Sequence, residues 1–304
     1  MIRYLKHKEI DFVKWDQCIE ASLSFMPYPL SWYLNCVSPN WDALVLNDYE
    51  AVMPLTHRKK FGISYLHQPL MCKQLGVFSS MHAEPFNIDL FIKALPKKFR
   101  LIEIALNNQN IINSNKTIKV DQHTNFYLSL NQPYQTIYNG FHRNHKRNIL
   151  KANDSGMVVK VNSISFTEFY NLKMDSLSKQ KINFKNHQKS SYFNIFKHFE
   201  DKGEMKIYTA YLNNTIISSA CFIFWEKWTA LDLFSTDLGK NNSAGYLLFN
   251  RFFKDYCERK LILDFMGSNV HGIALHNKGY GAIEDKYPFI TINRLPKFLK
   301  FFKK

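Results

Sequence analysis

The chain has 304 residues, of which 46% are hydrophobic and 15% aromatic, and its formal charge is +15. This composition supplies the cores of one large or two ordinary domains and excludes a disordered chain. Residues 1–100 carry 12 Lys/Arg against 9 Asp/Glu, whereas residues 101–304 carry 28 against 16. The positive surplus therefore rises from 3 to 12 between the two parts, and the second part favours anionic partners.

The first part alternates short helices and strands. Apolar residues at helical spacing predict a helix over 10–22, and two apolar runs joined by Asn47-Asp48 predict a hairpin over 41–55. A strand is expected to end at Gln68-Pro69, and further strands are expected at 100–106 and 124–130.

The second part begins with a helix expected over 133–152, followed by a strand at 157–161 and helices around 165–178 and 188–200. Three strands at 204–212, 215–225 and 227–236 are separated by tight turns and predict an antiparallel meander. A helix over 241–260, a strand over 261–266, a short helix, a Gly-rich turn and a last strand follow. This order predicts the α/β class (α+β mixed sheets), with domains at 1–132 and 133–304.

Neither a leader nor a membrane span is expected. The N-terminus lacks the apolar core of a signal peptide, and the apolar run 220–225 is far shorter than the roughly 20 residues of a membrane helix. The five cysteines have no paired or metal-type spacing (Cys18, Cys36, Cys72, Cys221 and Cys257). We therefore expect a cytoplasmic protein with reduced thiols, no disulfide framework, no bound metal and no transmembrane segment.

The helix expected over 133–152 carries two different faces. Apolar residues recur every three or four positions (Tyr134, Tyr138, Phe141, His145, Ile149 and Ala152), and a basic row of Arg143, Arg147 and Lys151 lies roughly opposite. Arginine can bind phosphate with two parallel hydrogen bonds, so Arg143 and Arg147 are candidate anion-binding residues. A solvated charged face is the alternative. No zinc-finger, KH or RRM signature is present, so sequence-specific DNA binding is not expected.

Two further stretches could form a site. At 235–254 a strand and a polar loop with Gly239 lead into a helix at Ser243, Ala244 and Gly245, where free N–H groups could bind an anion. An ordinary capped helix is the alternative.

At 263–287, Asp264 lies in an apolar strand, where its carboxylate must be paired, exposed or functional. Ser268, Asn269, Lys278 and Tyr280 follow it. No G-x-S-x-G elbow, local Cys–His signature or H-E-x-x-H motif is present, so the sequence offers no covalent nucleophile or zinc site.

The segments "KRNILKANDSGMVVKV" and "DFMGS…IALHNKGYGA" resemble the FemABX-like branch of the GNAT N-acyltransferase superfamily over about 135–292. Tyr280 stands where Phe is usual in that branch, and His276 stands where an aromatic residue is usual. In the first part, "QPLMCKQLGVF" (68–78) is similar to a segment of related uncharacterised proteins. The resemblance implies two GNAT-like lobes in tandem, the first on the substrate side, with a substrate cleft between them.

The resemblance also implies direct transfer of an acyl group from an activated carrier to an amine of a small molecule or peptide. The carrier would be acetyl-CoA or another acyl-CoA, with its pyrophosphate near Gly239 and Ser243–Gly245. The alternative, from the peptidoglycan-bridge members, is an aminoacyl-tRNA donor and a bacterial cell-wall precursor as acceptor. A non-catalytic pair of lobes that binds an anionic ligand is the third hypothesis.

Candidate site residues follow from the residue patterns and from the resemblance. The catalytic candidates are Asp264 or Asp232 as base, directly or through water, and Lys278 for the oxyanion or the carrier phosphate. Tyr280 or Tyr246 is the candidate proton donor to the leaving group. The substrate-binding candidates are Arg143, Arg147, Gln68, Ser268 and Asn269.

Overall fold

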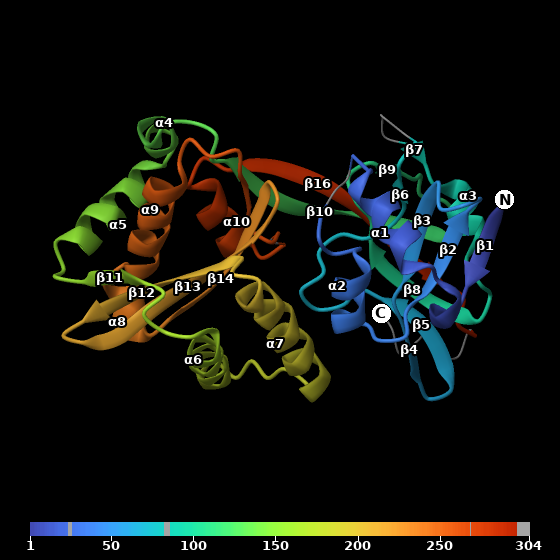
Figure 1. Ribbon diagram of the computed structural model, residues 1–304, viewed down its shortest axis with the longest axis horizontal. Coiled ribbons are helices and arrows are strands. Elements are labelled where there is room, and N and C mark those ends of the chain that lie inside the picture. The colour runs from blue at the N-terminus through green and yellow to red at the C-terminus, as the bar shows by residue number, and fades with distance from the viewer. Residues whose placement is uncertain (24–25, 82–85, 268, 297–304) are drawn as a thin grey trace. The chain divides into compact units, whose positions relative to one another are not determined.

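A computed structural model describes residues 1–304 except 24–25, 82–85, 268 and 297–304. The chain divides into two compact units (Figure 1). Unit 1 comprises Met1–Thr124 and the segment that starts at Lys286, and unit 2 comprises Asn125–Asp285. Strands β10 (Ile118–Ser129) and β16 (Ile283–Asn293) each contribute residues to both units. The division therefore differs from the predicted split at 132/133, because the last strand returns to the unit formed by the first part.

Unit 1 is built on β-structure. Strands β1 (Ile2–Leu5), β2 (Asp42–Leu46), β3 (Ala51–Leu55) and β6 (Phe78–Ser79) form one antiparallel sheet, in which β2 and β3 are the predicted hairpin. Strand β8 (Phe99–Ala105) pairs with β16 and with β5 (Ile63–His67), which pairs with β4 (His57–Lys60). The pair β7 (Phe86–Asn87) and β9 (Asn110–Ile111) completes the strands described in this unit.

The helices of unit 1 are short: η1 (His7–Glu9), α1 (Phe12–Glu20), α2 (Ser31–Val37) and α3 (Asp89–Ala94). Asp11 caps α1 by accepting the N–H groups of Val13 and Lys14, which explains why the helix predicted from residue 10 begins at Phe12. Apolar side chains from α3 and from both sheets meet in one buried core, which contains Met53, Phe91 and Ile102.

Unit 2 is built on one mixed sheet with the strand order β11-β12-β13-β14-β15-β10. The predicted antiparallel meander is confirmed: β12 (Met205–Leu212), β13 (Thr215–Trp225) and β14 (Trp228–Ser235) pair in sequence. Its first turn uses Asn213 and Asn214, both at positive φ, as two-residue hairpin turns require. Strand β11 (Val158–Val161) is antiparallel to β12, whereas β15 (Ile262–Asp264) is parallel to β14 and antiparallel to β10.

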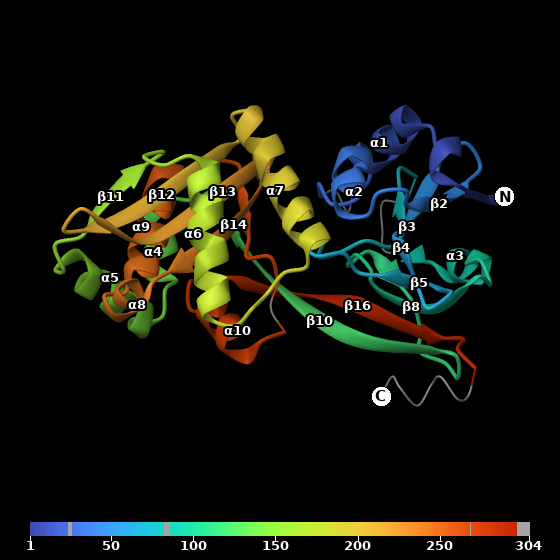
Figure 2. The same cartoon turned by 90° about the horizontal axis from the view of Figure 1, so that it is seen from below.

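Helices cover both faces of this sheet (Figure 1, Figure 2). One face carries α4 (Tyr134–Asn139), α5 (Arg143–Asn153), α9 (Ala244–Tyr256) and α10 (His271–Lys278), and there the rings of Phe222 and Phe252 stack at 3.7 Å. The other face carries α6 (Phe166–Lys179) and α7 (Asn186–Asp201). A short helix, α8 (Asp237–Asn241), joins β14 to α9. These layers match the predicted fold class.

One predicted helix is broken in two, and another begins later than expected. The helix expected over 133–152 stops at Gly140, because His142 is extended and its N–H donates to the carbonyl of Gly279 at 2.9 Å. A Cβ on Gly281, which has φ +76°, would lie 2.9 Å from the carbonyl oxygen of Gly140, so this approach requires glycine. The helix expected over 241–260 begins at Ala244, because Ser243 adopts the left-handed conformation and separates α8 from α9.

Candidate functional site

Strands β14 and β15 part shortly after they meet. They pair in parallel only from Trp228–Ala230 to Ile262–Asp264, whereas β14 continues to Ser235. In the described part of the chain, Leu231–Ser235 therefore has no strand on its β15 side. Ligands bind preferentially beyond the carboxyl ends of parallel strands where neighbouring strands separate. This free edge of β14 is the first candidate for a functional site.

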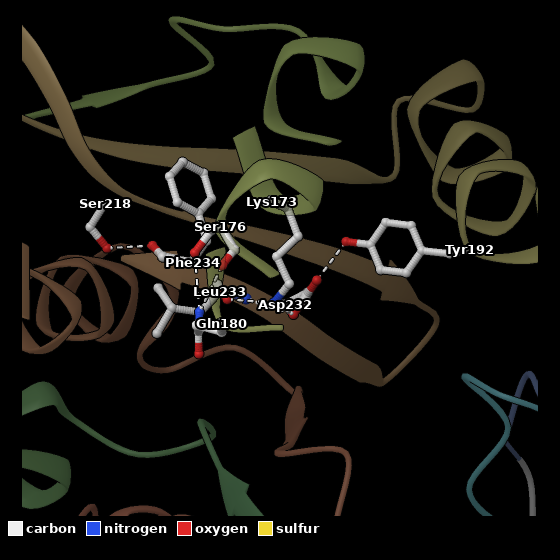
Figure 3. A network of polar contacts seen from close by, with 8 residues as sticks. All are labelled: Lys173, Ser176, Gln180, Tyr192, Ser218, Asp232, Leu233 and Phe234. Carbon is white, nitrogen blue, oxygen red and sulfur yellow. Dashed lines mark hydrogen bonds and ion pairs between the residues drawn. The ribbon is translucent and has the colours of Figure 1, made fainter. Parts of the chain in front are cut away.

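A polar network occupies the free edge (Figure 3). Lys173 of α6 places its Nζ 2.7 Å from Oδ1 of Asp232 and 2.6 Å from the carbonyl oxygen of Leu233. Tyr192 of α7 donates its hydroxyl to Oδ2 of the same carboxylate at 2.5 Å, and the N–H of Leu233 donates to Oδ1 at 2.9 Å. Both backbone polar groups of Leu233 are thus bound by side chains, as an unpaired strand edge requires.

The Lys173–Asp232 pair is largely shielded from water. The two side chains are 14% and 20% exposed, so loss of either partner would leave a mostly buried charge uncompensated. Burial, reinforced by the Asp232 carboxylate, raises the pKa of Tyr192 well above its usual value. Tyr192 is therefore a neutral hydrogen-bond donor at physiological pH. Asp232 was predicted as a site residue, whereas Lys173 and Tyr192 were not.

A cavity of about 310 Å³ adjoins this network. It is lined by α6, the end of β14 and α8 (Lys173, Ser176, Leu177, Gln180, Leu233, Phe234, Ser235 and Lys240). Three residues of α6 and Gln180, which follows its last residue, recur at i, i+3, i+4 and i+7. This mostly polar stripe, which begins on the helix predicted at 165–178, is the sequence signal that could have revealed them.

Asp264 is enclosed rather than open to a ligand. It is 1% exposed, and its carboxylate accepts hydrogen bonds from Trp228 Nε1 (2.9 Å), Asn125 Nδ2 (2.9 Å) and the N–H of Met266 (2.7 Å). Of the three outcomes considered for a carboxylate in this strand, pairing is the one observed. The bond to Met266 holds a turn in which Met266 and Gly267 both have positive φ. Ser268 lies outside the described residues, and Asn269 is exposed just beyond it.

The predicted phosphate-binding residues lie where α5 meets α8 and α9. Ser243 is 7% exposed and donates its hydroxyl to Asn148 Oδ1 at 3.0 Å, and Ala244 is fully buried. A Cβ on Gly239 would lie 2.2 Å from the carbonyl oxygen of Ile217, so that glycine is required by packing against the sheet. Gly245, which is half-buried, is the one predicted residue of this group with appreciable surface.

The basic helix α5 packs as its periodicity predicts. Phe141, His145, Ile149 and Ala152 are buried, whereas Arg143 and Arg147 are exposed. The described contact of the Arg147 guanidinium is with Asn144 of its own helix, at 2.8 Å. Lys151 instead donates to the carbonyl of Asn241 at 2.7 Å and so caps the end of α8.

Lys278 and Tyr280 occupy different environments at the end of α10. Lys278 is 54% exposed and lies 3.5 Å from Glu284. Tyr280 is fully buried against the imidazole of His145, with ring centroids 4.5 Å apart, and among the described residues its hydroxyl has no hydrogen-bond partner. Burial raises the pKa of Tyr280 and lowers that of the neighbouring His276 to about 4. The start of α5 binds the backbone at Gly279, so Arg143 and Lys278 belong to one region of unit 2.

Gln68 belongs to unit 1 and serves its backbone. Its Nε2 donates to the carbonyl of Cys72 at 2.6 Å, and its Oε1 accepts the N–H of Ala105 at 2.9 Å.

Within the described part of the chain, no helix is long and apolar enough to cross a bilayer. The same described residues contain no group of three or more His, Cys, Asp or Glu side chains arranged to hold a metal ion.

No family model and no curated protein matches the sequence. The structure of FemX matches with a TM-score of 0.65 at 11% identity, covering 98% of this chain and 99% of FemX. A tandem GNAT protein from the clavulanic acid biosynthesis pathway matches at 0.54 and 10% identity, covering 98% of this chain and 100% of that protein. The C-terminal domain of a putative lysylphosphatidylglycerol synthetase from Agrobacterium fabrum matches at 0.53 and 9% identity, covering 96% of this chain and 93% of that domain. At these identities the likeness establishes the fold, which is the FemABX-like, tandem GNAT fold that the sequence predicted.

Proposed function

We propose that this chain, with the fold of FemX and of tandem GNAT proteins, transfers an acyl group from an activated carrier to an amine. The observation that carries the proposal is the free edge of β14 beside a cavity and the Lys173–Asp232–Tyr192 network. The network places a carboxylate and an ammonium beside this unpaired part of the strand and next to the cavity.

The proposed reaction is direct. The amine nitrogen attacks the acyl carbonyl carbon, the bond to the carrier's sulfur or oxygen breaks, and the proton lost by the amine reaches the leaving group. Asp232 is the carboxylate that would relay this proton, directly or through water. We assign the enclosed Asp264 to positioning the turn after β15, and the exposed Lys278 to binding an anionic part of the carrier.

An acyl-CoA is the first proposed donor. Ala244 and Gly245 are the first two residues of the 13-residue helix α9, and no acceptor for their N–H groups is described. Of these two residues, only Gly245 is accessible. A Cβ added at Gly245 would lie 3.4 Å from the Leu233 side chain, so Gly245→Ala would fit the fold while crowding a bound pyrophosphate. We expect acetyl-CoA or a longer acyl-CoA to raise Tm, and both Gly245→Ala and Lys278→Ala to reduce that shift.

Activity is tested by mass spectrometry of products from a panel of acyl-CoAs and amines. Asp232→Asn should lower kcat by at least tenfold, whereas Asp175→Asn should leave it unchanged, because Asp175 is an exposed carboxylate on α6. Absence of acyl-CoA binding and of transfer across the panel would reject this donor. Binding that leaves every amine unmodified would instead favour the non-catalytic, anion-binding hypothesis.

An aminoacyl-tRNA is the second proposed donor, with a peptidoglycan precursor as acceptor. It is supported by the exposed Arg143 and Arg147 on α5 and by the burial of Ser243 and Ala244, which leaves little helix terminus for a pyrophosphate. Binding of tRNA should weaken steeply with salt, and each arginine replaced by alanine should reduce the slope by roughly one unit. Unchanged slopes in both variants, or no tRNA binding at low salt, would reject this donor.

A further inference from the structure

The cavity between α6, β14 and α8 has an unbalanced lining. Two of its side chains are cationic, Lys173 and Lys240, and of the described residues that line it none carries a carboxylate. Asp232 contacts Lys173 but is not among the lining residues. The cavity therefore presents cations to its contents while the compensating acids lie outside it.

Lys173 retains a donor for a ligand. An ammonium group has three N–H donors, and two of them are used by Asp232 Oδ1 and the Leu233 carbonyl. No third acceptor for its Nζ is found in the described part of the chain. Because the side chain is only 14% exposed, a hydrogen bond from this third donor to an anion would be poorly screened by water.

Lys240 gives the cavity its net positive charge. The charge of Lys173 is offset by Asp232, but among the residues that the structure describes Lys240 is paired only with Asp237, three residues earlier on α8, at 3.2 Å. Both side chains of that pair are exposed (53% and 94%), so the pair is weak and Lys240 can turn towards an anion at little cost.

The rest of the lining is apolar or carries neutral polar groups. Leu177 and Phe234 offer apolar surface, and the hydroxyl groups of Ser176 and Ser235 already take part in hydrogen bonds with Gln180 and Ser218. The volume of about 310 Å³ is at the small end of ligand sites. A fitting ligand is therefore small, with a short apolar body and one acidic group.

We propose that this cavity binds the carboxylate or phosphate of a small substrate through Lys173 and Lys240, with the substrate's apolar body against Leu177 and Phe234. The assignment as a substrate rests on the proposed acyl transfer, whereas the anion site itself does not. The acidic group belongs either to the acceptor amine or to the transferred acyl group, and both sources present the same chemistry to the cavity.

The binding test uses three probes of equal length: hexanoate, hexanamide and hexylamine, each titrated by calorimetry into the full-length protein. Hexanoate should bind saturably, hexanamide at least tenfold more weakly, and hexylamine not at all. Lys173→Met and Lys240→Met should each weaken hexanoate at least fivefold. Lys179→Met is the matched control, because Lys179 lies on the same helix, is 76% exposed and does not line the cavity.

Lys240→Met keeps the test decisive if Lys173→Met fails to fold, because the Lys240 side chain is exposed. Equal binding of hexanoate and hexanamide would overturn the proposal, and so would unchanged hexanoate binding in Lys240→Met or an equal loss in Lys179→Met.

Transfer assays then separate the two sources and the two proposals. Preference for 6-aminohexanoate over 6-aminohexanamide would place the acid on the acceptor, and preference for glutaryl-CoA over pentanoyl-CoA would place it on the acyl group. Transfer that is indifferent to charge in both comparisons would overturn the substrate assignment. Hexanoate binding without transfer from any acyl-CoA or aminoacyl-tRNA would support the anion site and overturn the proposed function.

Discussion

The imidazole of His276 should make unit 2 sensitive to acid. It lies at the junction of α5, α9 and α10, where its ring contacts the rings of His145, Tyr246 and Tyr280 at centroid distances of 5.1–5.2 Å. Burial lowers the pKa of His276 from 6.5 to about 4, and a smaller contribution comes from His145. The pKa of His145 is lowered as well, again mainly by burial.

The sign follows from the lowered pKa. As the pH falls below 6.5, the unfolded chain binds a proton at this imidazole before the folded chain does. The contribution to stability is thus complete above pH 6.5 and is lost progressively down to about pH 4. With about 1.4 kcal/mol per pKa unit, the loss between pH 7.5 and 4.5 is about 2.5 kcal/mol.

The perturbation that isolates this effect is His276→Phe. The variant keeps an aromatic ring in the cluster and leaves the backbone carbonyl that accepts the hydrogen bond from His145 Nε2. Its loss of stability between pH 7.5 and 4.5 should be smaller than that of the unchanged protein by about 2.5 kcal/mol. Titrating groups that do not contact His276 are common to both proteins and cancel in this comparison, whereas the neighbouring His145 is coupled to it.

Native-state hydrogen exchange of the α9 and α10 amides measures the opening free energy of this unit at each pH. His271→Phe is the control, because His271 is exposed at the start of the same helix, α10, and should leave the pH dependence unchanged. An identical pH dependence in the unchanged protein and in His276→Phe would refute the assignment of the acid sensitivity to this partly buried imidazole.

Three further substitutions test other parts of unit 2. Gly279→Ala should lower the free energy of unfolding by roughly 2 kcal/mol, because its Cβ would lie 1.9 Å from the His145 ring. Gly272→Ala, within the helix α10 that Gly279 follows, meets open space and should be neutral or slightly stabilising; urea unfolding measures both. Gly239→Ala should likewise lower Tm, because its Cβ would meet a backbone carbonyl of β13; an unchanged Tm with a lost CoA shift would show that this glycine contacts ligand instead. Asp264→Asn should lower the free energy of unfolding by roughly 2 kcal/mol, because one of the N–H donors that now face the carboxylate would instead face the amide N–H group of Asn. It should lower kcat without moving the acid limb of the pH–rate profile, and loss of that limb would show that Asp264 is the base.

Much of the fold could be predicted because its signals are local. The stripe of Phe141, His145 and Ile149 follows helical spacing, and the meander follows apolar runs separated by turn residues. The break in the helix expected over 133–152 and the later start of the helix expected over 241–260 were missed, because each involves a distant contact. His142 is held extended by the backbone at Gly279, and Ser243 bonds to Asn148 of another helix.

The same distinction between local signals and distant contacts applies to the candidate site. The sequence by itself determined which residues are chemically notable: an acid in the apolar strand β15, an acid on β14, and arginines on an exposed helical row. Only the tertiary structure decided that Asp264 is enclosed by Trp228 and Asn125, the latter 139 residues away in the chain. It also decided that Asp232 meets Lys173 across 59 residues at a strand edge left free when β15 ends. The physical reason is that burial and pairing of a charge depend on which elements pack together, and local periodicity carries no information about that packing.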